Sequence, residues 1–90
     1  MKKTNDIFLD MLPQIDLHGY DRDSAVVAVN DFILENIQLK NKKIIVIHGI
    51  GEGILKKAVK ECLERNKYVQ NHYIDNFNIG CTIVNLNIDN

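Results

Sequence analysis

The stretch Val46-Ile-His-Gly-Ile-Gly-Glu-Gly-Ile-Leu55 decides the fold of this chain. It joins an apolar run that starts at Ile44 to a segment whose apolar residues recur at helical spacing, with three glycines between them. The pattern predicts a strand, a glycine turn and a helix. Glycine adopts backbone angles that a Cβ would hinder, and it lets a ligand approach the main chain. The free N–H groups at the start of the following helix suit an anion, usually a phosphate.

Two well-known glycine motifs do not fit this turn. A P-loop would end in Gly-Lys-Ser or Gly-Lys-Thr, which is missing here. In the dinucleotide fingerprint G-x-G-x-x-G the third glycine comes one residue later than Gly53. A tight turn without a ligand is the plain alternative. A second His-Gly pair, His18-Gly19, argues against it because His48-Gly49 then has a counterpart.

The two His-Gly pairs follow two predicted strands, over residues 14–17 and 44–47. A helix is predicted between them over residues 22–39, so the segment forms a right-handed βαβ unit. Parallel strands end at the same edge of a sheet, which is where open α/β folds place their ligands. We therefore expect both histidines at this edge.

Asp16 and His18 lie on the same side of the first predicted strand, because side chains alternate along a strand. A carboxylate beside an imidazole can orient the ring and favour its charged form. The alternative is that Asp16 caps a turn and that His18 is a surface residue.

Beyond the glycine turn, a helix is predicted over residues 54–65 and carries Lys56 and Lys57 in its first turn. Lysines there oppose the helix dipole, and a bound phosphate would remove that penalty. The alternative is a solvated lysine-rich face. Strands are predicted over residues 68–77 and 81–86, joined by a turn at 78–80 and antiparallel to each other. His72 is assigned no role.

The bulk properties predict one domain. The chain has 90 residues, 46% of them hydrophobic, and a net charge of −1. Binding of nucleic acid by charge alone would require a basic domain, so any such contact depends on a local patch. Cys62 and Cys81 are too far apart for a C-x-x-C pair, and we expect buried, reduced thiols. No secretory signal or membrane span is legible, so we expect a cytoplasmic protein.

With these motifs in place, the sequence resembles the Smr (small MutS-related) domain family. Its first signature, D-L-H-G after an aliphatic residue, stands at residues 15–19, and its second, H-G-x-G-x-G followed by Leu and a basic residue, at 48–56. The strand that starts at Gly80-Cys-Thr-Ile-Val84 is similar to the family's G-x-T-x-V. The resemblance covers residues 14–86. We expect an N-terminal extension over residues 1–13, either one helical turn or a loose arm, and the Smr domain over 14–90.

The resemblance implies an α/β fold, a two-layer α+β sandwich of order βαβαββ with a four-stranded mixed sheet. That fold is similar to the C-terminal domain of translation initiation factor three. The family includes nucleases that act on DNA or RNA, some of them on mRNA at stalled ribosomes, and C-terminal domains of MutS-like ATPases. We expect a free-standing bacterial version. Ile50 stands where the family often has a basic residue, and this departure weakens the case for tight phosphate binding.

The leading functional hypothesis is an endonuclease that cleaves RNA, or that nicks DNA or cuts branched DNA. His18 and His48 would flank the phosphate, one as base and one as acid, and Asp16 would orient His18. The phosphate-binding residues would be Gly19, Gly49, Gly51, Gly53, Lys56 and Lys57. An attacking 2′-hydroxyl requires no metal. In the alternative mechanism, Asp16, His18 and His48 hold a divalent metal such as Mg or Mn that activates a water.

Two other classes of function remain open. One is a non-catalytic RNA- or DNA-binding module linked to the ribosome or to DNA recombination and repair. The other is a small-molecule phosphatase or nucleotide-binding protein, for which no specificity pocket is legible. We expect nucleic acid as the partner, with the ribosome as a candidate complex, no membrane, and a monomeric protein.

Overall fold

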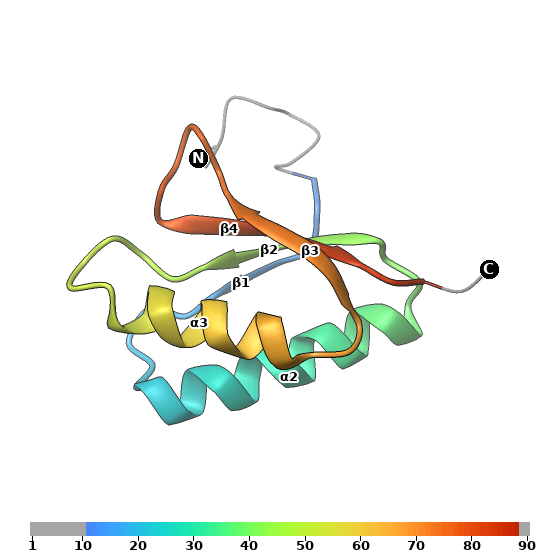
Figure 1. Cartoon of the computed structure of the whole chain (residues 1–90), viewed down its shortest axis with the longest axis horizontal. Helices are drawn as coiled ribbons and strands as arrows, with labels where there is room; N and C mark the ends of the chain where they lie inside the picture. Colours follow the sequence, from blue (N-terminus) through green and yellow to red (C-terminus); the bar gives the residue numbers. More distant parts are fainter. Residues whose placement is uncertain (1–10, 89–90) are drawn as a thin grey trace.

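In the computed structural model, which describes residues 11–88, six elements alternate in the predicted order. They are strand β1 (Gln14–Asp16), helix α2 (Arg22–Gln38), strand β2 (Lys43–Ile47), helix α3 (Ile54–Arg65), strand β3 (Val69–Ile74) and strand β4 (Cys81–Leu86). The strand order in the sheet is β1-β2-β4-β3. β1 and β2 are parallel, and β4 is antiparallel to both of its neighbours. Both helices cover one face of the sheet (Figure 1), which confirms the predicted two-layer sandwich with a mixed sheet.

The main hydrophobic core lies between the sheet and the two helices. Alternation along β2 sends Ile44 and Val46 into this core, while Ile45 belongs to a smaller cluster with Cys81 and Ile83. Ile44, Ile45 and Val46 are all fully buried, which explains why this central strand carries a continuous apolar run rather than an alternating pattern. The apolar stripe predicted for α2 is confirmed by the burial of Ala25, Val29 and Ile33.

The ends of β1 and β3 differ from the predicted ones because side chains and turns compete with the strands, and three further bounds shift by one residue. β1 ends at Asp16, since Leu17 already accepts a turn hydrogen bond from the N–H of Tyr20. β3 ends at Ile74, three residues before the predicted end, where the Asp75 carboxylate accepts from the N–H of Phe77 at 3.0 Å. The predicted lead-in before Pro13 lies mostly outside the described residues. No helix in the described range 11–88 is long and apolar enough to cross a membrane.

One buried polar residue of α2 was not predicted. Asn36 occupies a core position, where its amide donates to the carbonyl of Phe32 and its oxygen accepts from the side chain of Asn41, each at 2.8 Å. Both polar atoms are thereby satisfied, which makes the burial tolerable. The contact closes the C-terminal end of α2 against the turn that leads to β2.

Replacement of Ile33 by alanine tests the core between the sheet and α2. The side chain is fully buried, so its removal leaves a cavity and should lower the free energy of unfolding by about 2–5 kcal/mol. Chemical denaturation followed by circular dichroism measures the change. Leu34→Ala, at the neighbouring exposed position of the same helix, is the matched control and should cost well under half as much. Equal losses in the two variants would contradict the assignment of the core face.

Candidate functional site

Three connections meet at one edge of the sheet, named here the carboxyl edge. They are the turn after β1 (residues 17–21), the glycine loop after β2 (residues 48–53) and the hairpin turn between β3 and β4 (residues 75–80). Asp16 pairs with Ile47, and Ile47 pairs with Cys81, so the three connections leave neighbouring strand ends. All three lie at the left of Figure 1. His18 and His48 thus follow directly on adjacent strands.

The glycine loop has a backbone that other residues rarely adopt. Gly49, Gly51 and Gly53 have φ values of 80°, 27° and 83°. Gly53 is the N-cap of α3, and no side chain caps this helix. The first turn of α3 also lacks an acidic residue. In α2, by contrast, the carboxylate of the N-cap residue Asp21 accepts from the N–H of Ser24. The first turn of α3 therefore supplies no side-chain counter-charge to the positive end of its dipole, and the nearest carboxylate in the sequence is Glu52, just before the N-cap.

A small hollow of about 170 Å³ lies over this loop. It is lined by residues 48–56, which include four of the residues predicted to bind phosphate: Gly49, Gly51, Gly53 and Lys56. Gly19 lies on the adjacent turn after β1, where its φ is 82°. Lys57 is exposed on α3 and does not line the hollow. The structure thus gathers most of the predicted phosphate-binding residues around one small space.

His48 is buried at the base of the glycine loop, with 7% of its surface exposed. Its Nδ1 lies 2.9 Å from the carbonyl oxygen of Gly49, and its Nε2 lies 2.8 Å from Oγ1 of Thr82. A carbonyl only accepts, so Nδ1 carries the hydrogen and Nε2 accepts from the threonine hydroxyl. This assignment uses both ring nitrogens inside the protein.

The charge state of His48 follows from this environment. Burial lowers the pKa of His48 below its ordinary value of 6.5; the hydrogen bond to Gly49 opposes the shift, and the charge of Lys56 adds to it. The ring is therefore neutral at physiological pH. In this conformation His48 holds the glycine loop against β4.

His18 is exposed on the turn after β1, and Asp16 is exposed at the end of β1. One carboxylate oxygen of Asp16 accepts from the main-chain N–H of His18 at 2.9 Å. This is the turn-capping contact considered as the alternative to orientation of the ring. The carboxylate therefore fixes the backbone from which the exposed imidazole projects, and the ring itself is open to solvent.

Two residues that shape the site, Gly80 and Thr82, are not among the predicted site residues. The carbonyl of Gly80 accepts from the N–H groups of both His48 and Gly49, each at 2.9 Å. A Cβ at Gly80 would lie 3.2 Å from Cα of Gly49, which is tighter than most Cβ contacts, so the close contact favours glycine. Thr82 fixes the tautomer of His48. The available signal was a hydroxyl residue followed by two apolar residues, inside the third family motif.

The residues considered as metal ligands do not form a cluster. Among residues 11–88, no three His, Cys, Asp or Glu side chains gather in a way that could hold a metal ion, and this includes Asp16, His18 and His48. The Nε2 lone pair of His48 is directed at a hydroxyl donor. In this arrangement Asp16, His18 and His48 do not form a three-residue ligand set of their own.

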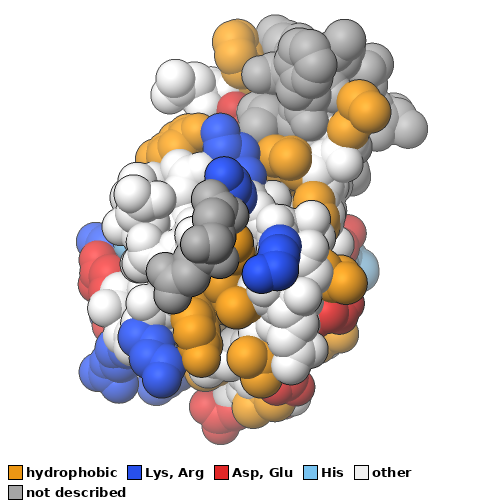
Figure 2. Space-filling model, turned by 90° about the vertical axis from the view of Figure 1, so that its right-hand side faces the viewer, with side chains coloured by type: hydrophobic (Ala, Val, Ile, Leu, Met, Phe, Trp, Pro, Cys, Tyr) orange, Lys and Arg blue, Asp and Glu red, His pale blue; other side chains and the backbone are white. Residues whose placement is uncertain are grey.

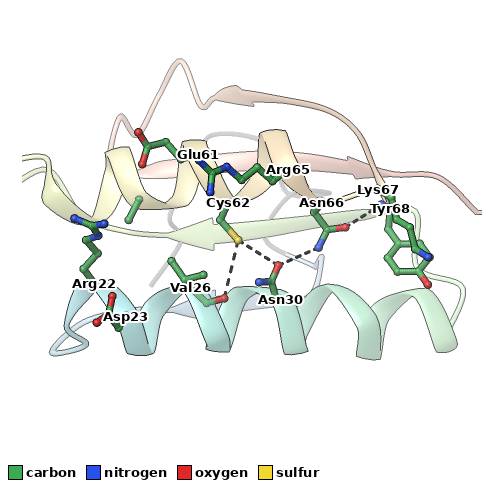
Figure 3. Close-up of a pocket in the computed structure, with 11 residues that line it drawn as sticks. Arg22, Asp23, Val26, Asn30, Glu61, Cys62, Arg65, Asn66, Lys67 and Tyr68 are labelled. Carbon is green, nitrogen blue, oxygen red and sulfur yellow. Dashed lines mark hydrogen bonds between the residues drawn. The ribbon is translucent and has the colours of Figure 1, made fainter.

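A larger hollow lies elsewhere, in a groove of about 630 Å³ between α2 and α3 (Figure 3). Its floor is a closed network in which Oδ1 of Asn30 accepts from the thiol of Cys62 at 3.2 Å and from the amide of Asn66 at 3.0 Å. Burial raises the pKa of Cys62, so the thiol stays neutral. Both cysteines are buried and neither is part of a disulfide, which confirms the prediction for them. The network joins the two helices, and the groove contains neither signature histidine.

The end of the molecule opposite the carboxyl edge has a hollow of about 430 Å³, lined by residues that include Ile37, Tyr68 and Ile88 and by neither signature histidine. Figure 2 shows it with basic, acidic and hydrophobic side chains interspersed. The candidate site is therefore the carboxyl edge, where the glycine loop, the open end of α3 and the exposed His18 lie together.

The burial of His48 predicts a specific pH dependence of stability. The unfolded chain protonates this ring near pH 6.5 and the folded chain only at lower pH, so the unfolded state binds the extra proton between the two values. The free energy of unfolding should therefore fall as the pH drops from 7.5 through 6.5. His48→Gln keeps a donor and an acceptor but cannot titrate, so its decline should be shallower. Urea denaturation across this range measures both slopes, and parallel slopes would contradict the assignment.

Substitution of Thr82 tests the hydrogen bond that fixes the His48 ring. Thr82→Val keeps the shape but leaves Nε2 buried without a donor, and this should lower the free energy of unfolding by about 1–3 kcal/mol. Thr82→Ser retains the hydroxyl and is the matched control. Ring nitrogen chemical shifts from NMR report the tautomer in each protein. An unchanged tautomer and stability in Thr82→Val would refute the role of the hydroxyl.

Comparison with known proteins gives consistent results. The Smr domain family matches residues 15–87. The chain is similar to endonuclease MutS2 of Clostridium tetani (35% identical, 77% of this chain and 9% of that protein) and of Alkaliphilus metalliredigens (28% identical, 86% and 10%). It thus spans about a tenth of the length of these curated relatives.

Two solved structures have the same fold. The Smr domain of Thermus thermophilus MutS2 superposes with a TM-score of 0.82 at 28% identity, over 84% of this chain and 99% of that one. YdaL of Escherichia coli, a stand-alone small MutS-related protein, superposes with a TM-score of 0.76 at 20% identity, over 81% and 63%. The similarity to YdaL shows a shared fold and nothing more. On the family match over residues 15–87, the chain belongs to the Smr domain family.

Proposed function

We propose that this domain binds nucleic acid at the carboxyl edge and acts there as an endonuclease on RNA, with DNA nicking or cleavage of branched DNA as the second substrate class. One observation carries the proposal: an exposed imidazole, His18, stands beside a glycine loop that leaves the N-terminus of α3 without a side-chain cap. That end of a helix attracts phosphate. Similarity to proteins named endonuclease MutS2 supports the same class of reaction.

In the proposed mechanism a phosphate of the substrate occupies the hollow over the glycine loop, where main-chain N–H groups and Lys56 balance its charge. On RNA, the 2′-hydroxyl attacks the phosphorus and the bond from phosphorus to O5′ breaks. His18 exchanges a proton with the reacting oxygens, a task that histidine performs well near neutral pH. The products are a 2′,3′-cyclic phosphate and a 5′-hydroxyl, and no metal takes part.

The role of His48 in this mechanism is primarily to position the glycine loop. Its neutral ring donates to Gly49 and accepts from Thr82, so it holds the loop in the shape that receives the phosphate. Direct proton transfer by His48, as in the scheme with two acting imidazoles, requires the bond to Thr82 to open first.

A second candidate function is binding without catalysis, as part of a complex such as the ribosome. The engagement of both ring nitrogens of His48 favours this candidate, because a locked neutral ring leaves a single free imidazole for acid–base chemistry. The exposed His18 favours the nuclease, because binding alone has no need of it. Cleavage and binding therefore have to be measured side by side.

The decisive experiment is cleavage of end-labelled single-stranded RNA, duplex DNA and branched DNA, with and without EDTA. His18→Ala should reduce RNA cleavage by about 10²-fold or more, since positioned acid–base groups contribute 10²–10⁴-fold. Cleavage by the unsubstituted protein should survive EDTA and leave 5′-hydroxyl ends. His72→Ala, in β3 away from the carboxyl edge, is the matched control and should cleave normally.

The other outcomes separate the candidates. Loss of cleavage in EDTA would overturn the metal-free mechanism. Equal cleavage by the unsubstituted protein and His18→Ala would show that the cleavage does not depend on this site. Binding of all three substrates without cleavage would establish the binding module instead.

A further inference from the structure

Exposed apolar side chains are concentrated around the candidate site. Of the ten large hydrophobic residues that are exposed within residues 11–88, five lie on the carboxyl edge or at the first position of α3. They are Tyr20, Ile50, Ile54, Phe77 and Ile79. A site that contacts only phosphate would be surrounded by polar and basic side chains. Apolar surface gathered beside a phosphate site therefore points to contact with a second, uncharged part of the ligand.

Phe77 is the most exposed of the five, at 66%, although the hairpin turn that carries it is well ordered by hydrogen bonds. Its N–H donates to the Asp75 carboxylate, and Oδ1 of Asn78 accepts from the N–H of Gly80, each at 3.0 Å. The N–H of Cys81 then closes the turn on the carbonyl of Asn78 at 3.0 Å. The exposed ring is thus held on a structured support.

The hairpin turn is also fastened to the glycine loop. The carbonyl of Gly80 accepts from the N–H groups of His48 and Gly49, so the end of the hairpin turn lies against the glycine loop. Phe77 therefore lies on the side of that loop that faces β3.

Tyr20 stands on the other side, at the end of the turn after β1. Its N–H donates to the carbonyl of Leu17 at 3.0 Å, and 43% of the residue is exposed. The strand order β1-β2-β4-β3 puts the glycine loop between the turn after β1 and the hairpin turn. Tyr20 and Phe77 therefore lie on turns at opposite sides of the glycine loop, beyond β1 and β3, whose neighbours in the sheet are about 4.8 Å away.

We propose that Tyr20 and Phe77 stack on unpaired bases and that the substrate class of the site is single-stranded nucleic acid. This inference rests on the proposed function, because the bases are brought to the rings by the phosphate bound between them. Bases in a duplex are stacked on one another and offer only their edges, whereas unpaired bases offer their faces to aromatic side chains.

The charge of the chain supports the same conclusion. A net charge of −1 gives little general attraction to a phosphate backbone, and Ile50 replaces a basic residue that the resemblance leads one to expect in the glycine loop. Stacking on aromatic rings supplies affinity that does not depend on net charge. The two apolar flanks and the weakly charged centre are thus parts of one binding mode.

The test uses fluorescence anisotropy with three labelled probes of equal length: an oligouridine strand, an abasic strand with the same phosphates, and an RNA duplex. The oligouridine strand should bind most tightly. Phe77→Ala should weaken its binding by about 5- to 100-fold and leave binding of the abasic strand within about twofold. Tyr20→Ala should act in the same way. Tyr73→Ala, an exposed aromatic position on β3 itself and not on the hairpin turn, is the matched control and should bind normally.

A spectroscopic readout follows from the absence of tryptophan in the chain. Phe77→Trp introduces one indole at the proposed stacking position, and its emission should be quenched by oligouridine and not by the abasic strand. Tyr73→Trp should respond to neither.

The outcomes distinguish this inference from the function on which it rests. If the abasic strand or the duplex binds as tightly as oligouridine, or if Phe77→Ala and Tyr20→Ala bind normally, base stacking is refuted while phosphate binding stands. If none of the three probes binds, the proposed function falls and this inference falls with it.

Discussion

The arrangement of the carboxyl edge depends on one buried imidazole. His48 bridges the carbonyl of Gly49 and the hydroxyl of Thr82, which are 33 positions apart in the chain, and thereby ties the loop after β2 to the strand beside it. A buried polar ring is tolerated only when its nitrogens are paired, and here each has one partner of the right type. The glycine loop owes its definite shape to this contact, because glycines alone would leave it many conformations.

Positive φ at three glycines and a fixed ring at the base give the loop its shape, and α3 begins at its end without a side-chain cap. A loop of this kind presents dipoles without needing a strongly basic surface, which is compatible with a net charge of −1. The apolar residues on both flanks fit the same picture. Weak general electrostatics make the site dependent on contacts of defined geometry, and those contacts lie on turns that the sheet holds in place.

Much of the fold was predictable because local pattern and tertiary environment agree. The run Ile44–Ile47 is β-branched and apolar on both faces, and it proved to be the buried central strand β2. The three-and-four spacing in α2 predicted its buried face. The end of β3 was predicted wrongly, because the carboxylate of Asp75 captures the N–H of Phe77 and starts a turn where β-forming residues continue.

The details of the site were harder to predict, because they depend on residues far apart in sequence. Alternation along β2 continues to His48 and gives the face on which its ring lies, but not its burial or its neutral state. Those follow from Thr82, which arrives from β4. Similarly, Asp16 was equally suited to an imidazole and to a main-chain N–H. The main-chain N–H of His18 lies only two residues away in the same turn, so it is the partner that the short Asp16 side chain reaches more easily.

The double acceptor at Gly80 has a consequence for motion. One carbonyl oxygen holds the amides of His48 and Gly49, so neither strand end can swing away without releasing the pair. The glycine loop and the hairpin turn therefore open and close as a single cooperative unit, and their amide protons should exchange with solvent at a common rate. A ligand that displaces the glycine loop therefore also displaces the hairpin turn. Residues on both sides of the site then respond to the same bound ligand.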